Sequence, residues 1–313
     1  NIREFTTPAT TEKYYLDNNV FRWERDFYSA NLTFVQQFRQ EGHELKFFGF
    51  FSGRDGSQKQ DRREILTDEN WEPLENDPYL LRSTEAGPSK NFRFEADYVK
   101  PILEDGKFEA GYHYRLDDDA EDYFLEEFDY DLGQWVRDDR YTRETTFDRT
   151  IHAAYGIFSH NFKGFQYQLG LRGEYTYRRI DVLNENTSSV VDRFDYFPSV
   201  HISKRVKEKN QFMGSYSRRI ERPRSWYLEP FVTYVDESTR RIGNPDLLPE
   251  YTDSFEIGFL RTLEAGTFTI ETYYRNTQNK ITRISTFDQE SGFFINTFEN
   301  LNDDQALGIE SSF

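Results

Sequence analysis

The sequence predicts an all-β fold, an antiparallel up-and-down transmembrane β-barrel with about twelve strands in this chain. Three observations predict it. Many segments alternate apolar and polar residues one by one, which is the period of a strand with two unlike faces. The connections between these segments alternate in length. The 313 residues include 21 tyrosines and 30 phenylalanines, which favour strands and the interfacial girdles of membrane barrels.

The mean hydropathy of −0.87 excludes a helical membrane protein, and the sequence has no apolar run of about 18 residues. A membrane barrel remains compatible with this value, because only every second residue of its strands faces lipid.

The first half of the chain, after a start with little signal at 1–21, predicts strands at 22–40, 44–54, 90–100, 107–116 and 148–161. In the third of these, Phe92 and Phe94 alternate with Arg93. Two highly charged stretches, 55–89 and 117–147, predict long loops between the strands.

The second half predicts strands at 165–180, 193–206, 211–220, 251–262, 267–285, 293–299 and 306–313. The first of these alternates most clearly, with Leu169 and Leu171 on one face and Arg172 and Glu174 on the other. At about 3.3 Å per residue it would be roughly 50 Å long, well beyond the usual ~17–20 Å of a strand in a soluble protein. Such length predicts strands that project past the membrane.

The connections fall into two alternating classes. Short turns are predicted near residues 42, 105, 164, 209, 265 and 303, and longer loops at 55–89, 117–147, 182–192, 221–250 and 286–292. In an up-and-down membrane barrel the short turns face the periplasm and the longer loops face outside. A soluble β-sandwich has no reason to sort its loops in this way.

The two faces of the strands predict two surroundings. The apolar face would meet lipid, and the polar face would line a water-filled or plugged lumen. The polar face carries both signs of charge, as in Arg172 with Glu174 and Glu271 with Arg275. The alternative is a soluble sheet, whose apolar face would be buried against a second layer.

One stretch carries spaced motifs over about forty residues. These are Ser217–Ile220, Arg222–Pro223, Pro230–Phe231, Gly243–Glu250 and Ser254–Gly258, with weaker matches at Gly170–Thr176, Phe197–Ser199 and Gly308–Glu310. Over residues 150–313 the chain resembles the barrel of TonB-dependent outer-membrane receptors, and in particular the outer-membrane β-barrel proteins of Bacteroidetes-type bacteria.

The resemblance implies a 22-stranded barrel filled by an N-terminal plug, which imports scarce nutrients with force from an inner-membrane complex. This chain has room for about half of those strands, so residues 1–313 are predicted to be one barrel segment of a larger barrel. No stretch predicts a plug domain or a signal peptide. An independently closed twelve-stranded barrel is the alternative.

Composition excludes several other classes of protein. The formal charge of −17 argues against a general nucleic-acid binder, since phosphate contacts need clustered lysine and arginine. The chain has no cysteine, and its five histidines share no short ligand spacing. It contains no Gly-rich phosphate loop, nucleophile elbow or zinc-protease motif, so we expect no enzyme.

An acidic run follows the strand at 107–116. Asp117, Asp118, Asp119, Glu121 and Asp122 offer hard oxygen ligands of the kind that hold Ca²⁺, so calcium is the one cofactor the sequence suggests. The spacing does not fit an EF-hand loop. The alternative is a solvated acidic loop without metal.

A cationic and aromatic cluster lies in the long excursion at 221–250 and the strand before it. Such a cluster could grip an anionic or sugar ligand through forked hydrogen bonds and ring stacking. Its members are Arg218, Arg219, Arg222, Arg224, Trp226 and Tyr227. The alternative is that the arginines brace the loop through ion pairs with Glu221, Glu229 and Asp236.

The sequence therefore predicts the barrel portion of a TonB-dependent receptor in the outer membrane, which imports a metal chelate, glycan or peptide. Expected partners are outer-membrane lipid, the TonB energy-transducing complex through a plug, and a surface lipoprotein. Two alternatives stay open: a passive or structural outer-membrane barrel, and a soluble β-rich glycan-binding module.

Overall fold

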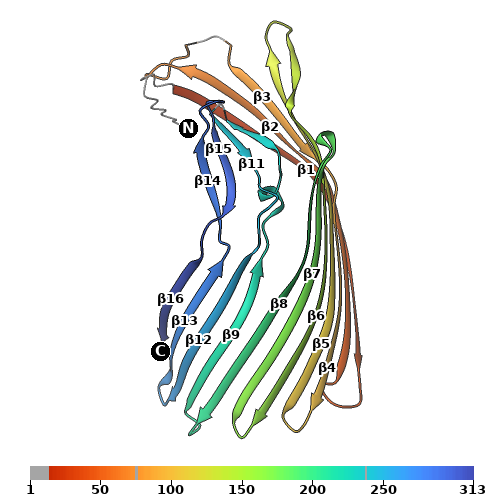
Figure 1. The fold of residues 1–313 in the computed structure, drawn as a ribbon, viewed down its shortest axis with the longest axis vertical. Helices are drawn as coiled ribbons and strands as arrows, with labels where there is room; N and C mark the ends of the chain where they lie inside the picture. Colours follow the sequence, from red (N-terminus) through yellow and green to blue (C-terminus); the bar gives the residue numbers. More distant parts are fainter. Residues whose placement is uncertain (1–13, 75–76, 237) are drawn as a thin grey trace.

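A computed structural model describes residues 14–74, 77–236 and 238–313, and most of them lie in β-strands. They form one twelve-stranded antiparallel sheet and a separate four-stranded sheet (Figure 1). Two short 3-10 helices, η1 (Leu183–Glu185) and η2 (Ser225–Tyr227), lie in connections. No helix in the described ranges is long and apolar enough to cross a membrane.

The large sheet follows the chain from one strand to its neighbour. Its strands are β1 (Tyr14–Gln37), β2 (Glu44–Thr67), β3 (Tyr79–Ala86), β4 (Ser89–Ile102), β5 (Gly106–Asp129), β6 (Gln134–Phe162), β7 (Phe165–Val182), β8 (Thr187–Val206), β9 (Asn210–Glu221), β12 (Glu250–Leu263), β13 (Gly266–Gln278) and β16 (Asp304–Ser312). β3 and β4 both pair with β2 and β5, so they share one position in the sheet.

The break between β3 and β4 has a local cause. Gly87 has a φ of 159° and is followed by Pro88, which has no N–H to donate to a sheet. A Cβ on Gly87 would lie 1.9 Å from the carbonyl oxygen of Ala120, so only glycine lets the two backbones come this close.

Five short turns lie at one end of the large sheet, and the two long connections that contain the second sheet lie at the other, where the turns after β5 and β7 are also short (Figure 1). The turns at 38–43, 103–105, 163–164, 207–209 and 264–265 confirm five of the six predicted short turns. At 163–164, Lys163 and Gly164 both have positive φ, as a two-residue type I′ hairpin turn requires. The sixth turn, predicted near 303, does not lie at this end, because the connection there joins the four-stranded sheet to the last strand of the large sheet.

The two faces of the strands differ as the sequence predicts. Leu171 and Ile257 are 56% and 68% exposed on the outer face, although both are large apolar side chains in mid-strand. On the opposite face Glu174 and Asp195 are buried. A soluble sheet would reverse this arrangement, so the outer face is the surface that meets lipid.

The predicted loops at 55–89 and 117–147 are wrong. β2 continues to Thr67, β3 occupies 79–86, and β5 and β6 form a hairpin whose turn is only 130–133. Likewise, β8 already begins at Thr187 within the predicted loop 182–192, and β1 begins before residue 22. Beyond the membrane both faces of a strand can be polar, so the backbone pairing continues where the hydrophobic alternation stops.

The second sheet, here called the loop sheet, contains one strand and part of another that the sequence places in the large sheet, which we call the wall. The members of the loop sheet are β10 (Val232–Asp236), β11 (Thr239–Ile242), β14 (Ile281–Phe287) and β15 (Phe294–Asn300), in the order β10-β11-β15-β14. The predicted strand 267–285 is thus divided between β13 in the wall and β14 in the loop sheet. The predicted strand 293–299 is β15, which pairs with β14 and, in parallel, with β11.

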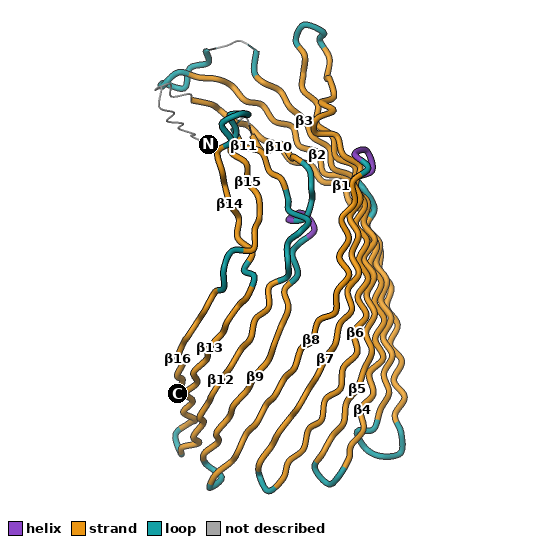
Figure 2. The backbone as a smooth tube through the Cα atoms, viewed as in Figure 1, coloured by secondary structure: helices purple, strands orange, loops and turns teal. Residues whose placement is uncertain are grey.

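The large sheet has two free edges within the described part of the chain. β1 pairs there only with β2, and β16 only with β13 (Figure 2). The sheet is curved but not closed. In hydrocarbon each unpaired backbone group costs several kcal/mol, so the membrane-spanning parts of these edges require further strands beside them.

Placing a charge on the lipid-facing side should destabilise the barrel. We expect Leu171→Arg to lower the free energy of unfolding by about 2–4 kcal/mol, the cost of an arginine near the bilayer midplane. Denaturant titration of the complete protein in lipid vesicles measures it. Gln168→Arg, on the polar face of the same strand, is the control and should change stability far less. Equal effects of the two variants would contradict the assignment of the faces.

Candidate functional site

The inner face of the wall is held together by ion pairs between strands and excursions. Arg172 and Glu174 are two residues apart on β7 and pair at 2.6 Å. Arg222, from the excursion after β9, reaches the same carboxylate at 2.5 Å and also donates to the hydroxyl of Thr176. One carboxylate therefore fastens the start of the excursion to the wall.

The acidic run lies in β5 and not in a loop, which corrects the predicted acidic loop. Strand alternation places Asp117, Asp119 and Glu121 on one face and Asp118 and Asp122 on the other. Asp117 is buried between Arg115 at 2.9 Å and Arg149 at 2.8 Å. The five residues therefore do not converge on one point.

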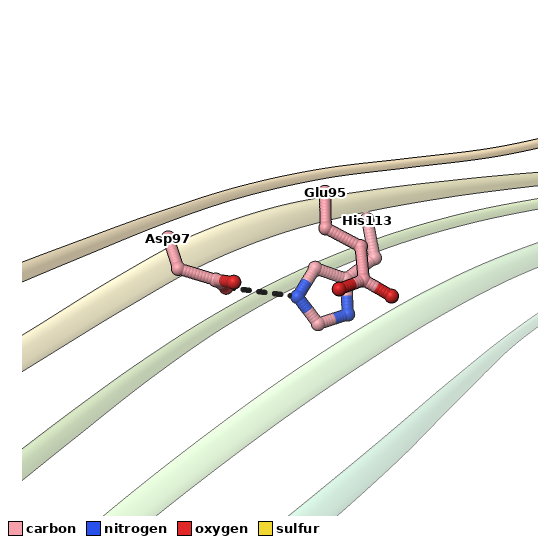
Figure 3. Close-up of side chains that lie close together, drawn as sticks. All are labelled: Glu95, Asp97 and His113. Carbon is pink, nitrogen blue, oxygen red and sulfur yellow. Dashed lines mark hydrogen bonds and ion pairs between the residues drawn. The ribbon is translucent and has the colours of Figure 1, made fainter. Parts of the chain in front are cut away.

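A second polar group lies lower on the inner face. Glu95 and Asp97 on β4 and His113 on β5 have ligand atoms within 4.8 Å of one another, close enough to be considered for a metal ion (Figure 3). Nε2 of His113 lies 2.9 Å from Asp97, and Nη1 of Arg172 lies 3.2 Å from its Nδ1. A guanidinium can only donate, so Nδ1 accepts and Nε2 carries the proton. Both ring nitrogens are thus occupied, and the group forms a hydrogen-bonded network.

The loop sheet packs on the inner face of the wall through two apolar clusters. In the first, Val232 and Tyr234 of β10 meet a cluster formed by Leu81, Tyr123, Leu125 and Tyr141. In the second, Leu228 and Leu247 from the excursion and Phe298 from β15 surround Ile180 of β7. Segments far apart in the sequence therefore pack together in these two clusters at the long-loop end.

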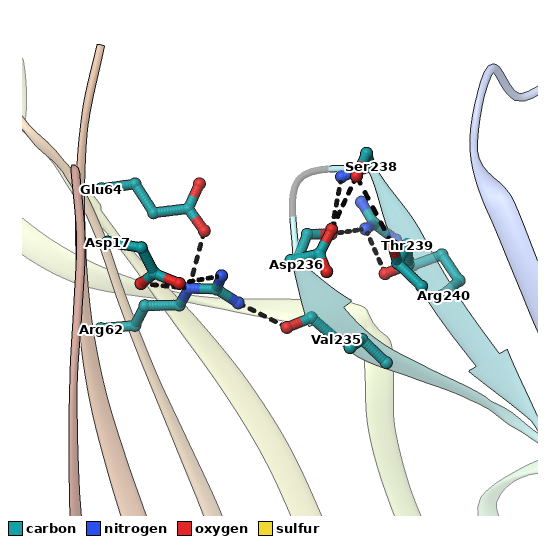
Figure 4. A network of polar contacts seen from close by, with 8 residues as sticks. All are labelled: Asp17, Arg62, Glu64, Val235, Asp236, Ser238, Thr239 and Arg240. Atoms are coloured by element: carbon teal, nitrogen blue, oxygen red, sulfur yellow. Dashed lines mark hydrogen bonds and ion pairs between the residues drawn. The ribbon is translucent and has the colours of Figure 1, made fainter. Parts of the chain in front are cut away.

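Two arginines reinforce this contact, and Figure 4 shows one of them, Arg62, reaching from the wall to Val235 of the loop sheet. Arg62 of β2 pairs with Asp17 at 2.7 Å and Glu64 at 2.6 Å, and it also donates to the carbonyl oxygen of Val235 in β10. Arg240 of β11 donates to the hydroxyl of Tyr141 at 2.6 Å. One arginine thus comes from the wall and one from the loop sheet.

A cavity of about 330 Å³ lies between the wall and the loop sheet. Its lining includes Glu85, Glu121, Tyr123, Trp226, Glu229 and Arg241. Burial, with the neighbouring Glu85 and Glu229, raises the pKa of Glu121 to about 8. Burial also raises the pKa of Glu229, although Arg241 pairs with it at 3.2 Å. We call this space the acidic cavity.

A second cavity, of about 230 Å³, lies on the inner face of β4–β7, and we call it the arginine cavity. Arg93, Arg115, Arg172 and Arg222 line it, together with Glu95 and Glu174. Arg178, on β7 above it, is only 6% exposed and forms no ion pair with the described residues. Its one hydrogen-bond acceptor there is the carbonyl oxygen of Pro245, at 2.8 Å.

The predicted cationic and aromatic cluster is not a single site. Arg218 pairs with Asp253 at 3.3 Å, while Arg222 points to Glu174. The rings of Trp226 and Tyr227 pack on Phe298 of the loop sheet, and Arg219 and Arg224 are exposed. Arg218 and Arg222 do form ion pairs, as the alternative prediction expects. Their partners are Asp253 and Glu174, however, and not Glu221, Glu229 or Asp236.

Most of the residues that line the two cavities could not be identified as site residues from the sequence. Glu85 belongs to a stretch predicted as a loop, Glu121 is identified only as a member of the acidic run, and Arg93 only as a member of a polar face. Their convergence depends on strand register, which pairs Arg93 with Arg115 directly across β4 and β5. The alternation of β4 and β5 could identify the face, but not the neighbours on it.

Removing the side chain of Arg240 should release the loop sheet from the wall. Arg240→Ala loses the hydrogen bond to Tyr141, and bonds to charged groups contribute about 1.5–3 kcal/mol. We therefore expect limited proteolysis within 222–249 to become about tenfold faster or more. Arg219→Ala, an exposed arginine, is the control. Unchanged cleavage in Arg240→Ala would show that this contact does not hold the sheet.

The attachment of the loop sheet should also depend on pH. The ordinary pKa of Glu121 is 4.5, and its value in the closed cavity is about 8. The closed form therefore binds the proton more tightly, so closure is strongest below pH 4.5 and weakens as pH rises to about 8. The groups that face Glu121 are Glu85, Asp119, Glu229 and Arg241.

The measurement is the cleavage rate within 222–249, taken as the ratio of the native protein to Glu121→Gln at each pH. The ratio removes the pH dependence of the protease itself. We expect it to rise between pH 4.5 and pH 8. A flat ratio would mean that Glu121 does not couple closure to protonation.

Comparison with known proteins identifies the family. No curated protein matches the sequence. Residues 36–313 match the model of the family described as outer membrane protein beta-barrel family. Among solved structures, the chain is similar to the hemophore receptor HasR of Serratia marcescens in complex with its hemophore HasA and heme. The TM-score is 0.54 at 12% identity, over 91% of this chain and 51% of that chain.

It is also similar to the ferric citrate transporter FecA, with a TM-score of 0.54 at 13% identity over 93% of this chain and 39% of that one. For the RagAB peptide importer, the TM-score is 0.55 at 17% identity, over 93% of this chain and 34% of that one. The chain thus spans about half or less of the length of these structures. These likenesses establish a shared β-barrel fold. By its family match, the chain belongs to the outer membrane protein beta-barrel family and is a β-barrel protein of the outer membrane.

Proposed function

We propose that this chain is the barrel portion of a TonB-dependent outer-membrane receptor that imports a nutrient. The observation that carries the proposal is the loop sheet, which is fastened over the polar inner face by Arg62, Arg240 and two apolar clusters. A receptor needs such a cover, because a ligand captured from dilute solution must be held before it crosses the membrane.

The free edges of the wall support a larger barrel. β1 and β16 each lack a second partner among the described residues, and an open edge in lipid is costly. Further strands up to the family's 22 would close the wall. The same reasoning disfavours an independently closed barrel formed by the described strands alone.

The passive barrel is the second candidate. It is favoured by the concave polar face at the short-turn end, where a space of about 710 Å³ is lined by polar residues of β5–β9, β12, β13 and β16. The cover at the other end argues against it, because a passive pore gains nothing from an ordered four-stranded sheet above its mouth. A soluble glycan-binding module is excluded by the outer-membrane family and the exposed apolar face.

Partners follow from the same proposal. The TonB complex would act through a plug domain of the complete receptor, and a surface lipoprotein would dock at the long-loop end. Calcium binding by Asp117, Asp118, Asp119, Glu121 and Asp122 stays a prediction. Asp117 already pairs with two arginines, so an ion would have to be held by Asp119 and Glu121 on the same face or by Asp118 and Asp122 on the opposite face.

Uptake in cells tests the proposal. A strain lacking the complete gene should lose uptake of one nutrient class from a panel of ferric chelates, haem, peptides and oligosaccharides. In the parent strain a protonophore should abolish the same uptake, because import by such a receptor needs energy. Gene replacement with Arg219→Ala should restore uptake, and replacement with Arg240→Ala should restore less of it.

The passive alternative has a distinct outcome. It expects uptake that persists with the protonophore, and a large steady conductance of the purified complete protein in planar bilayers. Either result would overturn the receptor proposal.

A further inference from the structure

The arginine cavity carries more positive charge than its own carboxylates balance. Glu174 is shared between Arg172 and Arg222, and Asp117 is shared between Arg115 and Arg149. Arg93 forms no ion pair with any described residue. This excess stands out in a chain whose formal charge is −17, so it is a local property of the inner face.

The guanidinium groups also keep free donors. Arg115 uses Nε and Nη2 on Asp117, Arg172 uses Nε and Nη1 on Glu174 and His113, and Arg222 uses Nη2 alone. The remaining N–H groups of these three make no hydrogen bond with the described residues, and none of those nitrogens is a buried atom without a partner. These nitrogens are therefore accessible to solvent, and the three residues that carry them line the cavity.

The surroundings hold these donors in place. The Asp117 carboxylate fixes Arg115, and the Glu174 carboxylate fixes both Arg172 and Arg222. Arg172 donates a hydrogen bond to His113, and Asp97 orients the imidazole ring by accepting one from it. The Asp97 carboxylate is in turn held by the hydroxyl of Tyr155, which donates to it at 2.7 Å. Guanidinium groups that are already held in position lose little conformational entropy when they bind a planar or tetrahedral oxyanion.

Gly111 makes this arrangement possible. It lies directly across the β4–β5 pair from Asp97. A Cβ at this position would meet the Tyr155 ring at 2.4 Å and the Asp97 carboxylate at 2.7 Å. Without glycine here the ring could not lie across the strand to reach Asp97, and the chain from Tyr155 to Arg172 would be broken.

We propose that the arginine cavity binds the carboxylate or phosphate group of a small ligand on the inner face of β4–β7. Arg93, Arg115, Arg172 and Arg222 supply the charge and the forked donors, and Glu95 closes one side. Arg178 extends the positive charge toward the excursion, since it is buried without a carboxylate of its own. The proposal assigns a small oxyanion as the class of ligand. This assignment rests on the proposed import function and makes it more specific.

Direct binding to the purified complete protein in detergent tests this, with citrate and inorganic phosphate as probes. We expect citrate to bind the native protein by isothermal titration, with an affinity that falls as salt is added. Arg93→Gln should weaken it tenfold or more. Arg93 makes no ion pair with a described residue and donates one side-chain hydrogen bond, to Asn91, so its loss removes a binding charge and leaves the carboxylate contacts of Arg115, Arg172 and Arg222 in place.

Arg275→Gln is the control, because Arg275 lies on the same inner face but outside the arginine cavity, and its one ion pair, with Glu256 at 3.8 Å, is exposed. It should change citrate affinity less than twofold. Gly111→Ala should weaken binding by severalfold although it removes no charge. Heat-dependent gel mobility confirms that each variant still folds as a barrel.

The proposal is overturned if neither probe binds the native protein, which is also the result expected if a carboxylate side chain from elsewhere in the complete receptor fills the cavity. It is equally overturned if Arg93→Gln and Arg275→Gln weaken binding alike, since that would be a general effect of charge. These outcomes are separate from the proposed function, because energy-dependent uptake can persist when the purified protein binds no oxyanion.

Discussion

The structure depends on the requirement that every backbone N–H and C=O group at membrane depth be paired inside the sheet. Strands β4–β9, β12 and β13 meet it by pairing on both sides over their lower parts. Once the pairing is fixed, the alternation of side chains along each strand decides which face of the sheet each residue lies on. Each residue then faces either lipid or the lumen, and a shift of one residue would exchange the two sets.

The same pairing explains why the wall and the loop sheet have different compositions. In the wall, Leu171 and Ile257 face outward because the lipid phase accepts them. The loop sheet has no lipid beside it, so it is held by a small apolar core and by arginines that span the gap to the wall. Such contacts are weaker than continuous strand pairing, which makes this sheet the part of the molecule best suited to move.

Sequence alone could predict the fold because the hydrophobic period is strong wherever lipid is present. It located most wall strands and five of six short turns. It failed above the membrane, where Arg62 and Glu64 continue β2 without any apolar alternation. It also placed β14 and β15 in the wall, since a strand of either sheet has the same local pattern. The parallel pairing of β11 with β15 joins residues 55 positions apart in two different excursions and leaves no local signature.

The candidate sites were less predictable for a related reason. Arg222 was identified from its cluster, but its partner Glu174 lies on another strand, 48 residues away. Reading the cluster along the chain groups Arg218 with Arg222, whereas the fold sends them to Asp253 and Glu174. Cavity residues are brought together by register between strands, and one sequence without the register cannot specify which arginines meet.

The two cavities have opposite charge, and their positions on β5 relate them. Glu121 lines the upper one and Arg115 the lower, six residues apart along the same strand, or roughly 20 Å at ~3.3 Å per residue. An ionised Glu121 would repel an anionic ligand on its way down. Burial raises the pKa of Glu121 to about 8, so near neutral pH its carboxyl is mostly uncharged while the loop sheet is closed. The burial that closes the upper cavity thus also lowers the electrostatic barrier above the arginines.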